Sequence, residues 1–156
     1  YFSIFGKNLI LTSQENKLES NNKMEYWRTK GVAIASGKAK AQKGNEFKIK
    51  AEKLVWYLNE NDKKIDVKKI FGFENVSIYS NNEVAFSDKA LYNKESGICK
   101  LFGNVKLQKG DSFLTGDYAE VDLNKGISKL LPAPNFDKLN ENRVRALIDK
   151  KQNFEE

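Results

Sequence analysis

Three carboxylates, Glu52, Asp88 and Asp117, recur at one position of an internal repeat in this chain of 156 residues. Pairs of carboxylates can perform general acid and base chemistry, as they do in glycoside hydrolysis. Such a pair needs two different environments, because one group must stay protonated while the other is ionised. A shared repeat position gives all three groups the same environment. We therefore predict that they form hydrogen bonds at turns or strand ends, and that the protein is not an enzyme.

Side chains for other kinds of catalysis are scarce. The sequence has no histidine, which excludes Ser-His-Asp and Cys-His nucleophiles and every metal site built on histidine. The single cysteine, Cys99, can form neither an intramolecular disulfide nor a cysteine-rich zinc site. It is in phase with Leu101 and Val105, so we expect it to be a small buried apolar residue. The glycine-containing pairs at 103–104 and 110–111 are not phosphate loops, because no helix is predicted to follow them. No cofactor and no metal are expected.

Positive charge gathers in one segment. The formal net charge is +6, and residues 36–70 contain ten lysines and five acidic residues. Clustered lysines raise the local concentration of anions, so this segment could meet the phosphates of nucleic acid or of lipid, although a solvated strand face would carry the same excess. Binding of single-stranded nucleic acid also needs exposed aromatic rings among the lysines. Phe47 and Trp56 occupy alternating positions that are expected to face inward, so no nucleic-acid partner is expected.

The chain contains an internal repeat. Residues 102–119 align without a gap onto residues 73–90, at a spacing of 29 residues, so that Asp117 matches Asp88. A third copy, at a spacing of 66 residues, needs one inserted residue to bring Glu52 to the same place. Similarity at a fixed period of this size indicates a stacked architecture.

Each repeat unit is predicted to form β-strands. Apolar residues alternate with polar ones at period two, and pairs made of Gly, Asn or Asp at 44–45, 81–82 and 110–111 separate the runs. Glycine and asparagine tolerate the positive φ that tight hairpin turns require. We therefore predict an all-β fold of repeated antiparallel strand pairs. A single domain is expected over 9–148, with tails at 1–8 and 149–156.

The alternation places one set of side chains on a single face of these strands. A packed core accounts for part of this set, but it mixes bulky residues with small ones, which leaves room for a groove or an open cavity. The predicted interior consists of Ala39, Ala41, Phe47, Ile49, Leu54, Trp56, Val76, Ile78, Val84, Phe86, Ala90, Tyr92, Val105, Leu107, Phe113, Ala119, Val121 and Leu123. The terminal strands are expected to offer unpaired backbone groups to a partner strand, and they contain Leu9, Ile10, Leu11, Val144, Ala146 and Ile148.

The repeats resemble the LptA/OstA lipopolysaccharide-transport family. The signature of that family is similar to residues 102–111 followed by 114–123. Further similarities lie on either side of it, at 87–93 and, more weakly, at 36–57. Residues 143–146 resemble a motif found near the C-terminus of LptA-like chains, with Asn142 in place of a glycine. The order and spacing of these motifs carry the resemblance over residues 30–148, while the N-terminal region matches poorly.

The resemblance implies an OstA-like β-jellyroll in the periplasm of a Gram-negative bacterium. Such a protein takes lipopolysaccharide from an inner-membrane complex, shields the acyl chains in its apolar interior and hands the lipid to an outer-membrane translocon. The implied partners are lipopolysaccharide, bound through its lipid A part, LptC-like and LptD-like jellyrolls at the two membranes, and further copies of the chain joined head to tail. The family has no catalytic residues.

Other functions stay open at this point. The chain resembles in part the periplasmic domain of an LptC-like inner-membrane component, which normally begins with a membrane anchor. Residues 1–5 are apolar but lack the charged region of a signal peptide. A basic nucleic-acid-binding β-domain and a purely structural, adhesin-like repeat are alternatives from other classes. Salt-dependent binding to single-stranded DNA would indicate the nucleic-acid-binding domain. Absence of lipid uptake would indicate the structural repeat.

Overall fold

The computed structural model describes residues 1–13, 15–45, 47–61, 64–80 and 82–132. These residues form eleven strands and one 3-10 turn of helix, η1 (Arg28–Lys30), which confirms the predicted all-β fold. The strands are β1 (Phe2–Phe5), β2 (Leu9–Ser13), β3 (Asn16–Ser20), β4 (Lys23–Trp27), β5 (Val32–Lys43), β6 (Phe47–Asn61), β7 (Lys64–Ser80), β8 (Glu83–Asn93), β9 (Ile98–Lys109), β10 (Ser112–Asp122) and β11 (Ile127–Leu130).

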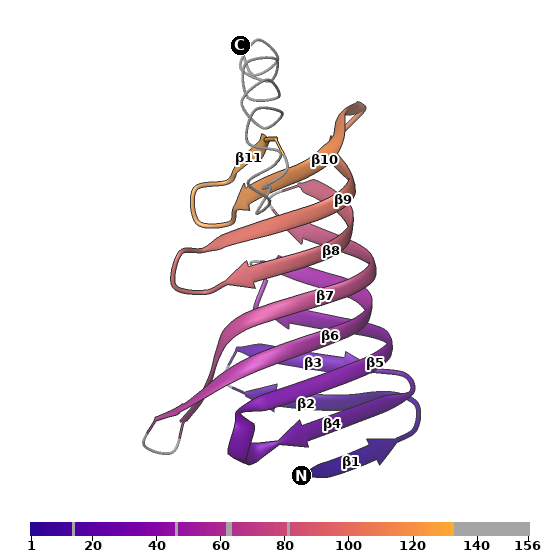
Figure 1. Ribbon diagram of the computed structural model, residues 1–156, viewed down its shortest axis with the longest axis vertical. Helices are drawn as coiled ribbons and strands as arrows, with labels where there is room; N and C mark the ends of the chain where they lie inside the picture. The colour runs from indigo at the N-terminus through magenta and orange to yellow at the C-terminus, as the bar shows by residue number, and fades with distance from the viewer. Residues whose placement is uncertain (14, 46, 62–63, 81, 133–156) are drawn as a thin grey trace, which may run out of the picture.

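The strands form one antiparallel sheet that is stacked along the long axis of the molecule (Figure 1). Its order is β1-β4-β5-β6-β7-β8-β9-β10-β11, so neighbours in the sequence are nearly always neighbours in the sheet. The hairpin of β2 and β3 pairs with the last residues of β5, while β4 pairs with its first residues. In the described part of the chain, no helix combines the length and the apolar character needed to span a bilayer.

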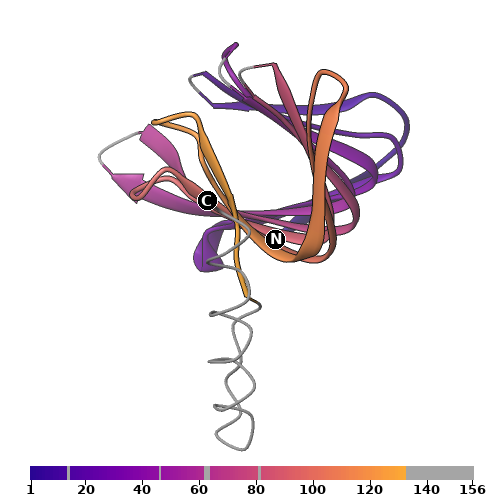
Figure 2. The ribbon, with the colours of Figure 1, turned by 90° about the horizontal axis from the view of Figure 1, so that it is seen from above.

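The sheet curls into two facing arms because its long strands are bulged in the middle (Figure 2). At each bulge two residues lie opposite one residue of the neighbouring strand, and positive φ angles occur there, as at Gly37 (86°) and Gly103 (79°). A bulge bends its strand and increases the local twist. We call the two halves arm A, formed by the described residues of 9–20, 38–51, 75–87 and 104–116, and arm B, formed by those of 2–5, 23–36, 53–73, 89–102 and 118–130.

The three recurring carboxylates lie at these bulges. Glu52, Asp88 and Asp117 are each the single residue opposite a bulge of two residues. All three side chains are exposed, and Asp88 accepts a hydrogen bond from Asn104 Nδ2 at 2.8 Å. They therefore mark the bend within the strands, not a turn or a strand end as we expected from the sequence.

The N-terminus is part of the sheet, so the predicted tail at residues 1–8 is wrong. Strand β1 pairs with β4, and the backbone N–H of Gly6 donates to the carbonyl of Asn22 at 2.9 Å. Aromatic rings support this pairing, since the Tyr1 and Trp27 centroids are 4.1 Å apart. The predicted last strand at 143–148 and the tail at 149–156 lie outside the described residues.

Candidate ligand-binding groove

The inner face of arm A carries an uninterrupted apolar row. Residues that pair directly across antiparallel strands share one face of the sheet, so the register can be followed from strand to strand. Starting at β2 and ending at β10, the row consists of Leu11, Leu18, Ala41, Ile49, Ile78, Ala85, Leu107 and Leu114. It runs across the strands, along the long axis of the molecule.

Arm B contributes a second row that is also apolar throughout. From β1 to β11 it consists of Ile4, Met24, Ala35, Leu54, Gly72, Ala90, Leu101, Ala119 and Leu130. A parallel row beside it contains Trp56, Ile70, Tyr92, Cys99 and Val121. The two arms face one another (Figure 2), and most residues of these rows pack together in one buried cluster between them. We call the rows the walls of a groove that follows the stack.

Most of the predicted interior residues lie on these walls. The buried ones are Ala39, Ala41, Phe47, Ile49, Leu54, Trp56, Val76, Ile78, Ala90, Tyr92, Val105, Leu107, Ala119 and Val121. Leu123 is partly buried and packs against the same cluster.

Three predicted interior residues belong to the outer face instead. Phe86 and Phe113 are 37% and 60% exposed, and Val84 is half-buried. Phe86 pairs directly with Lys106, while Val84 and Phe113 both pair with Gln108. Their pairing thus places the three side chains on the outer face, although Val84 and Phe113 also contribute atoms to the lining of the cavity described below.

The bulges explain the error. In β5, β7 and β9 the bulge occupies two residues. The inward residues therefore have the same parity, odd or even residue numbers, on both sides of the bulge. In β8 and β10 the single residue at the bend shifts the parity, so Ala85 and Ala90 both face inward. The predictions for Phe86 and Phe113 assumed that alternate residues face inward along the whole of β8 and β10. They therefore applied the pattern of the later half of each strand to the residues before Asp88 and Asp117, where the pattern is reversed.

Several groove residues were missed from the sequence. Leu11 was expected at a terminal strand only, and Leu18, Ala85, Leu101 and Leu114 were not singled out. The inserted residue that aligns Glu52 with its repeats did not reveal the change of parity, because the difference in length lies before β6. Three residues separate the paired Lys43 and Phe47, but only two separate Lys109 and Ser112.

Two contacts join the arms across the groove. Phe47, in arm A, and Tyr92, in arm B, have ring centroids 4.7 Å apart. Tyr92 belongs to the same row as Trp56, which lies in the other half of β6 from Phe47, so this contact crosses from one arm to the other. Nearer the C-terminal end, Ser128 Oγ donates a hydrogen bond of 2.9 Å to Glu83 Oε2. The groove is therefore narrow where these pairs meet.

A cavity of about 250 Å³ remains at the C-terminal end of the groove. Its apolar wall includes Ile78, Ala85, Leu107 and Val121, and its rim includes Glu83, Lys109, Ser112 and Ser128. A cavity with apolar walls and a polar rim suits an amphipathic ligand, with its hydrocarbon inside and its polar groups at the mouth.

The groove offers few polar groups of its own. The Trp56 side chain is 1% exposed, and its indole N–H has no hydrogen-bond partner among the described residues. Cys99 is fully buried, and burial raises the pKa of its thiol, so it stays neutral and unreactive. The interior is thus suited to bind apolar groups.

Comparison with known proteins agrees with this architecture. Residues 17–127 match the family described as LptA/(LptD N-terminal domain) LPS transport protein. The chain is also similar to the crystal structure of LptH, the LptA-homologous periplasmic component of the lipopolysaccharide transport device of Pseudomonas aeruginosa. The TM-score is 0.66 at 12% identity, over 76% of this chain and 82% of that chain. At this identity the likeness concerns the fold alone.

None of the curated proteins that were compared matches the sequence. The family match covers more than half of the chain, and the family is one of transport proteins and not of enzymes. The chain therefore belongs to the LptA/LptD N-terminal domain family, whose members transport lipopolysaccharide.

Proposed function

We propose that the protein is a periplasmic bridge that carries lipopolysaccharide between the inner-membrane export complex and the outer-membrane translocon. The observation that carries this proposal is the pair of uninterrupted apolar rows along the groove. Burial of acyl chains stabilises the complex by about 0.8 kcal/mol per CH₂, so a long lipid needs a continuous apolar track of this kind. Strands are about 4.8 Å apart in a sheet, so the eight strands of the arm A row span about 34 Å.

Binding requires the arms to separate. Pockets for small organic ligands measure roughly 300–1,000 Å³, so the existing cavity is too small for a molecule with several acyl chains. The Phe47–Tyr92 and Ser128–Glu83 contacts close the remaining groove and are broken when lipid enters. The exposed Lys109 at the rim then lies near the polar part of the lipid.

The two ends of the stack support head-to-tail assembly. Among the described residues, no strand pairs with the outer edge of β1, β2 or β11, and the first residues of β10 pair only with β9. Apolar side chains are exposed at both ends, including Phe5 and Ile10 at the first and Leu114 and Ile127 at the last. Open edges of this kind add a strand from a partner, which would join the grooves of neighbouring copies or of LptC-like and LptD-like jellyrolls.

Photo-crosslinking tests the groove directly. A photoreactive residue at Ile78 or Leu107, on the inner row, should capture lipopolysaccharide. The same residue at the adjacent positions Ser77 or Lys106 should not, because successive side chains of a strand point to opposite faces. The pair Val121 and Glu120 offers the same comparison in arm B. Equal capture at inner and outer positions would contradict the proposal.

Sedimentation tests the assembly. The full chain should form larger oligomers as its concentration rises. Phe5→Lys and Ile10→Lys together should reduce this association, because lysine deters edge-to-edge pairing and both side chains are already exposed. A strictly monomeric wild-type chain, or oligomers that the double substitution leaves unchanged, would be evidence against strand addition at this edge.

A further inference from the structure

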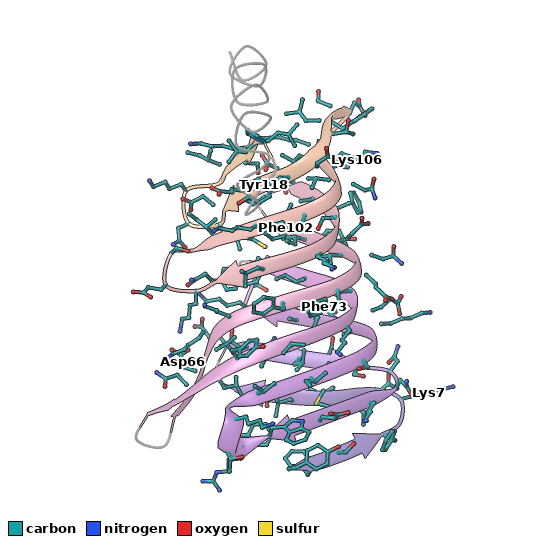
Figure 3. All side chains as sticks on the ribbon, viewed as in Figure 1. Lys7, Asp66, Phe73, Phe102, Lys106 and Tyr118 are labelled. Carbon is teal, nitrogen blue, oxygen red and sulfur yellow. The ribbon has the colours of Figure 1, made fainter. Side chains whose placement is uncertain are left out.

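The outer face of arm A carries exposed aromatic rings among lysines. Two rows of directly paired residues cross it, and the first consists of Lys48, Tyr79, Val84, Gln108 and Phe113. The second consists of Lys40, Lys50, Ser77, Phe86, Lys106 and Thr115. We call these two rows the basic aromatic face. Lys106 lies on the outer side of β9 (Figure 3), so this face is the reverse of the lipid groove.

The lysines of this face outnumber its acids. Glu19 on β3 pairs directly with Lys40 and so extends the second row, and it is the one acid among the described residues of the two rows. Lys40 and Lys50 lie directly opposite one another on β5 and β6, and like charges in such a pair repel. Glu19, on the neighbouring strand β3, lies 3.6 Å from Lys40 but forms a shorter contact of 2.9 Å with Lys17. A bound anion between Lys40 and Lys50 would relieve the repulsion that remains.

The rings and the ammonium groups form one surface. Lys50 Nζ lies 5.2 Å from the centroid of Tyr79, and Lys106 Nζ lies 4.8 Å from that of Phe113. These distances are in the range of cation–π attraction. Each lysine therefore lies over one face of a ring.

This geometry distinguishes two kinds of anionic partner. Nucleic-acid bases stack on open ring faces, but lysines occupy a face of Tyr79 and of Phe113. At a membrane surface, rings enter between the headgroups while lysines remain at the level of the phosphates. Lys48 and Tyr79 also line an open hollow of about 540 Å³ at the hairpin tips, where a headgroup has room.

We infer that the basic aromatic face binds the surface of a bilayer that contains anionic phospholipid. Its lysines attract the phosphate groups, and Tyr79, Phe86 and Phe113 enter the interface. The groove and this face are opposite sides of the same strands, so the protein can lie on a membrane while it holds lipid inside. The inference goes beyond the proposed function, because it concerns a second ligand and a separate surface.

Vesicle co-sedimentation tests the inference. The full chain should bind vesicles of phosphatidylglycerol and phosphatidylcholine, should not bind phosphatidylcholine alone, and should dissociate as NaCl is added. Each lysine near an anionic surface contributes about fivefold to the partition coefficient. We therefore expect Lys50→Gln with Lys106→Gln to lower binding by about 25-fold. Phe113→Ser should weaken binding further.

A matched control lies on the outer face of arm B. Lys100 and Lys129 are exposed, and Glu120 pairs directly with both of them. Lys100→Gln with Lys129→Gln removes the same charge but should leave vesicle binding nearly unchanged. If both double variants lose binding equally, or if the wild-type chain ignores anionic vesicles, the inference is wrong.

Two further readouts separate this inference from its alternatives. A fluorescent single-stranded oligonucleotide should bind more weakly than the anionic vesicles at equal salt, and the opposite order would overturn the assignment. Capture of lipopolysaccharide by a photoreactive residue at Ile78 should be unaffected by Lys50→Gln with Lys106→Gln. Loss of capture together with loss of vesicle binding would mean that the two surfaces are not independent.

Discussion

Gly103 holds the bend of β9 in a conformation that other residues adopt with strain. Its φ is +79°, and a Cβ atom built there would lie 2.7 Å from Asp88 Oδ2 and 3.2 Å from Asp88 Cβ. Gly103→Ala therefore forces the Asp88 carboxylate to move and breaks its hydrogen bond with Asn104. The left-handed backbone costs about 1–2 kcal/mol, and loss of the hydrogen bond about 1 kcal/mol. Alanine also lowers the conformational entropy of the unfolded chain, which offsets about 0.5 kcal/mol of these two costs.

We thus expect Gly103→Ala to lower the free energy of unfolding by about 2 kcal/mol, measured by urea denaturation. The control is Gly110→Ala in the β9–β10 turn, where φ is +58° and a Cβ would meet no atom within 4 Å. Strain alone should cost about 1 kcal/mol there. An Asp88→Ala background removes the carboxylate and its hydrogen bond but keeps the Cβ at 3.2 Å, so the penalty at Gly103 should fall by about 1 kcal/mol. The reasoning is refuted if Gly103→Ala and Gly110→Ala lower the free energy of unfolding by the same amount, both in the wild-type chain and in the Asp88→Ala chain.

Three further predictions concern the interior and one surface ion pair. Ala85→Phe should fill the cavity and abolish lipopolysaccharide binding with little loss of stability in urea. Ala90→Phe, at a buried position that does not line this cavity, should cost about 1–3 kcal/mol. The Cys99 thiol should not react with a maleimide in the native state and should react fully in denaturant; rapid native labelling would contradict its burial. The hydrogen bond from Lys17 lowers the pKa of Glu19, so its stabilisation is present at neutral pH and is lost as the pH falls through that lowered value. Lys17→Gln should raise the Glu19 pKa in an NMR titration, and an unchanged value would exclude Lys17 as the cause.

The sequence predicts much of the fold because the repeat and the period of two are both visible in it. The turns at Gly44, Asn82 and Gly110 have positive φ, as their residue types suggest. Inward positions in β7 and β9, such as Ile78 and Leu107, follow from alternation because the bulges of these strands preserve parity.

The remaining errors come from tertiary structure that alternation does not contain. Phe86 and Phe113 are more hydrophobic than Ala85, so residue type favoured the wrong face once the bulge was overlooked. The N-terminal strand was missed because β1 is short and is held by contacts with residues distant in sequence, such as Trp27 and Tyr26. The cross-groove contact of Phe47 with Tyr92 depends on the curl of the whole sheet.

The central claim is that the groove holds the acyl chains of lipopolysaccharide. Mass spectrometry of the lipid extracted from the protein, purified without detergent from a Gram-negative periplasm, tests this claim most directly. We expect lipid A species to be bound to the wild-type chain and lost from Ala85→Phe, while Lys50→Gln with Lys106→Gln retains them. Recovery of no lipid A from the wild-type chain, or of equal amounts from the chain with the filled cavity, would contradict the account.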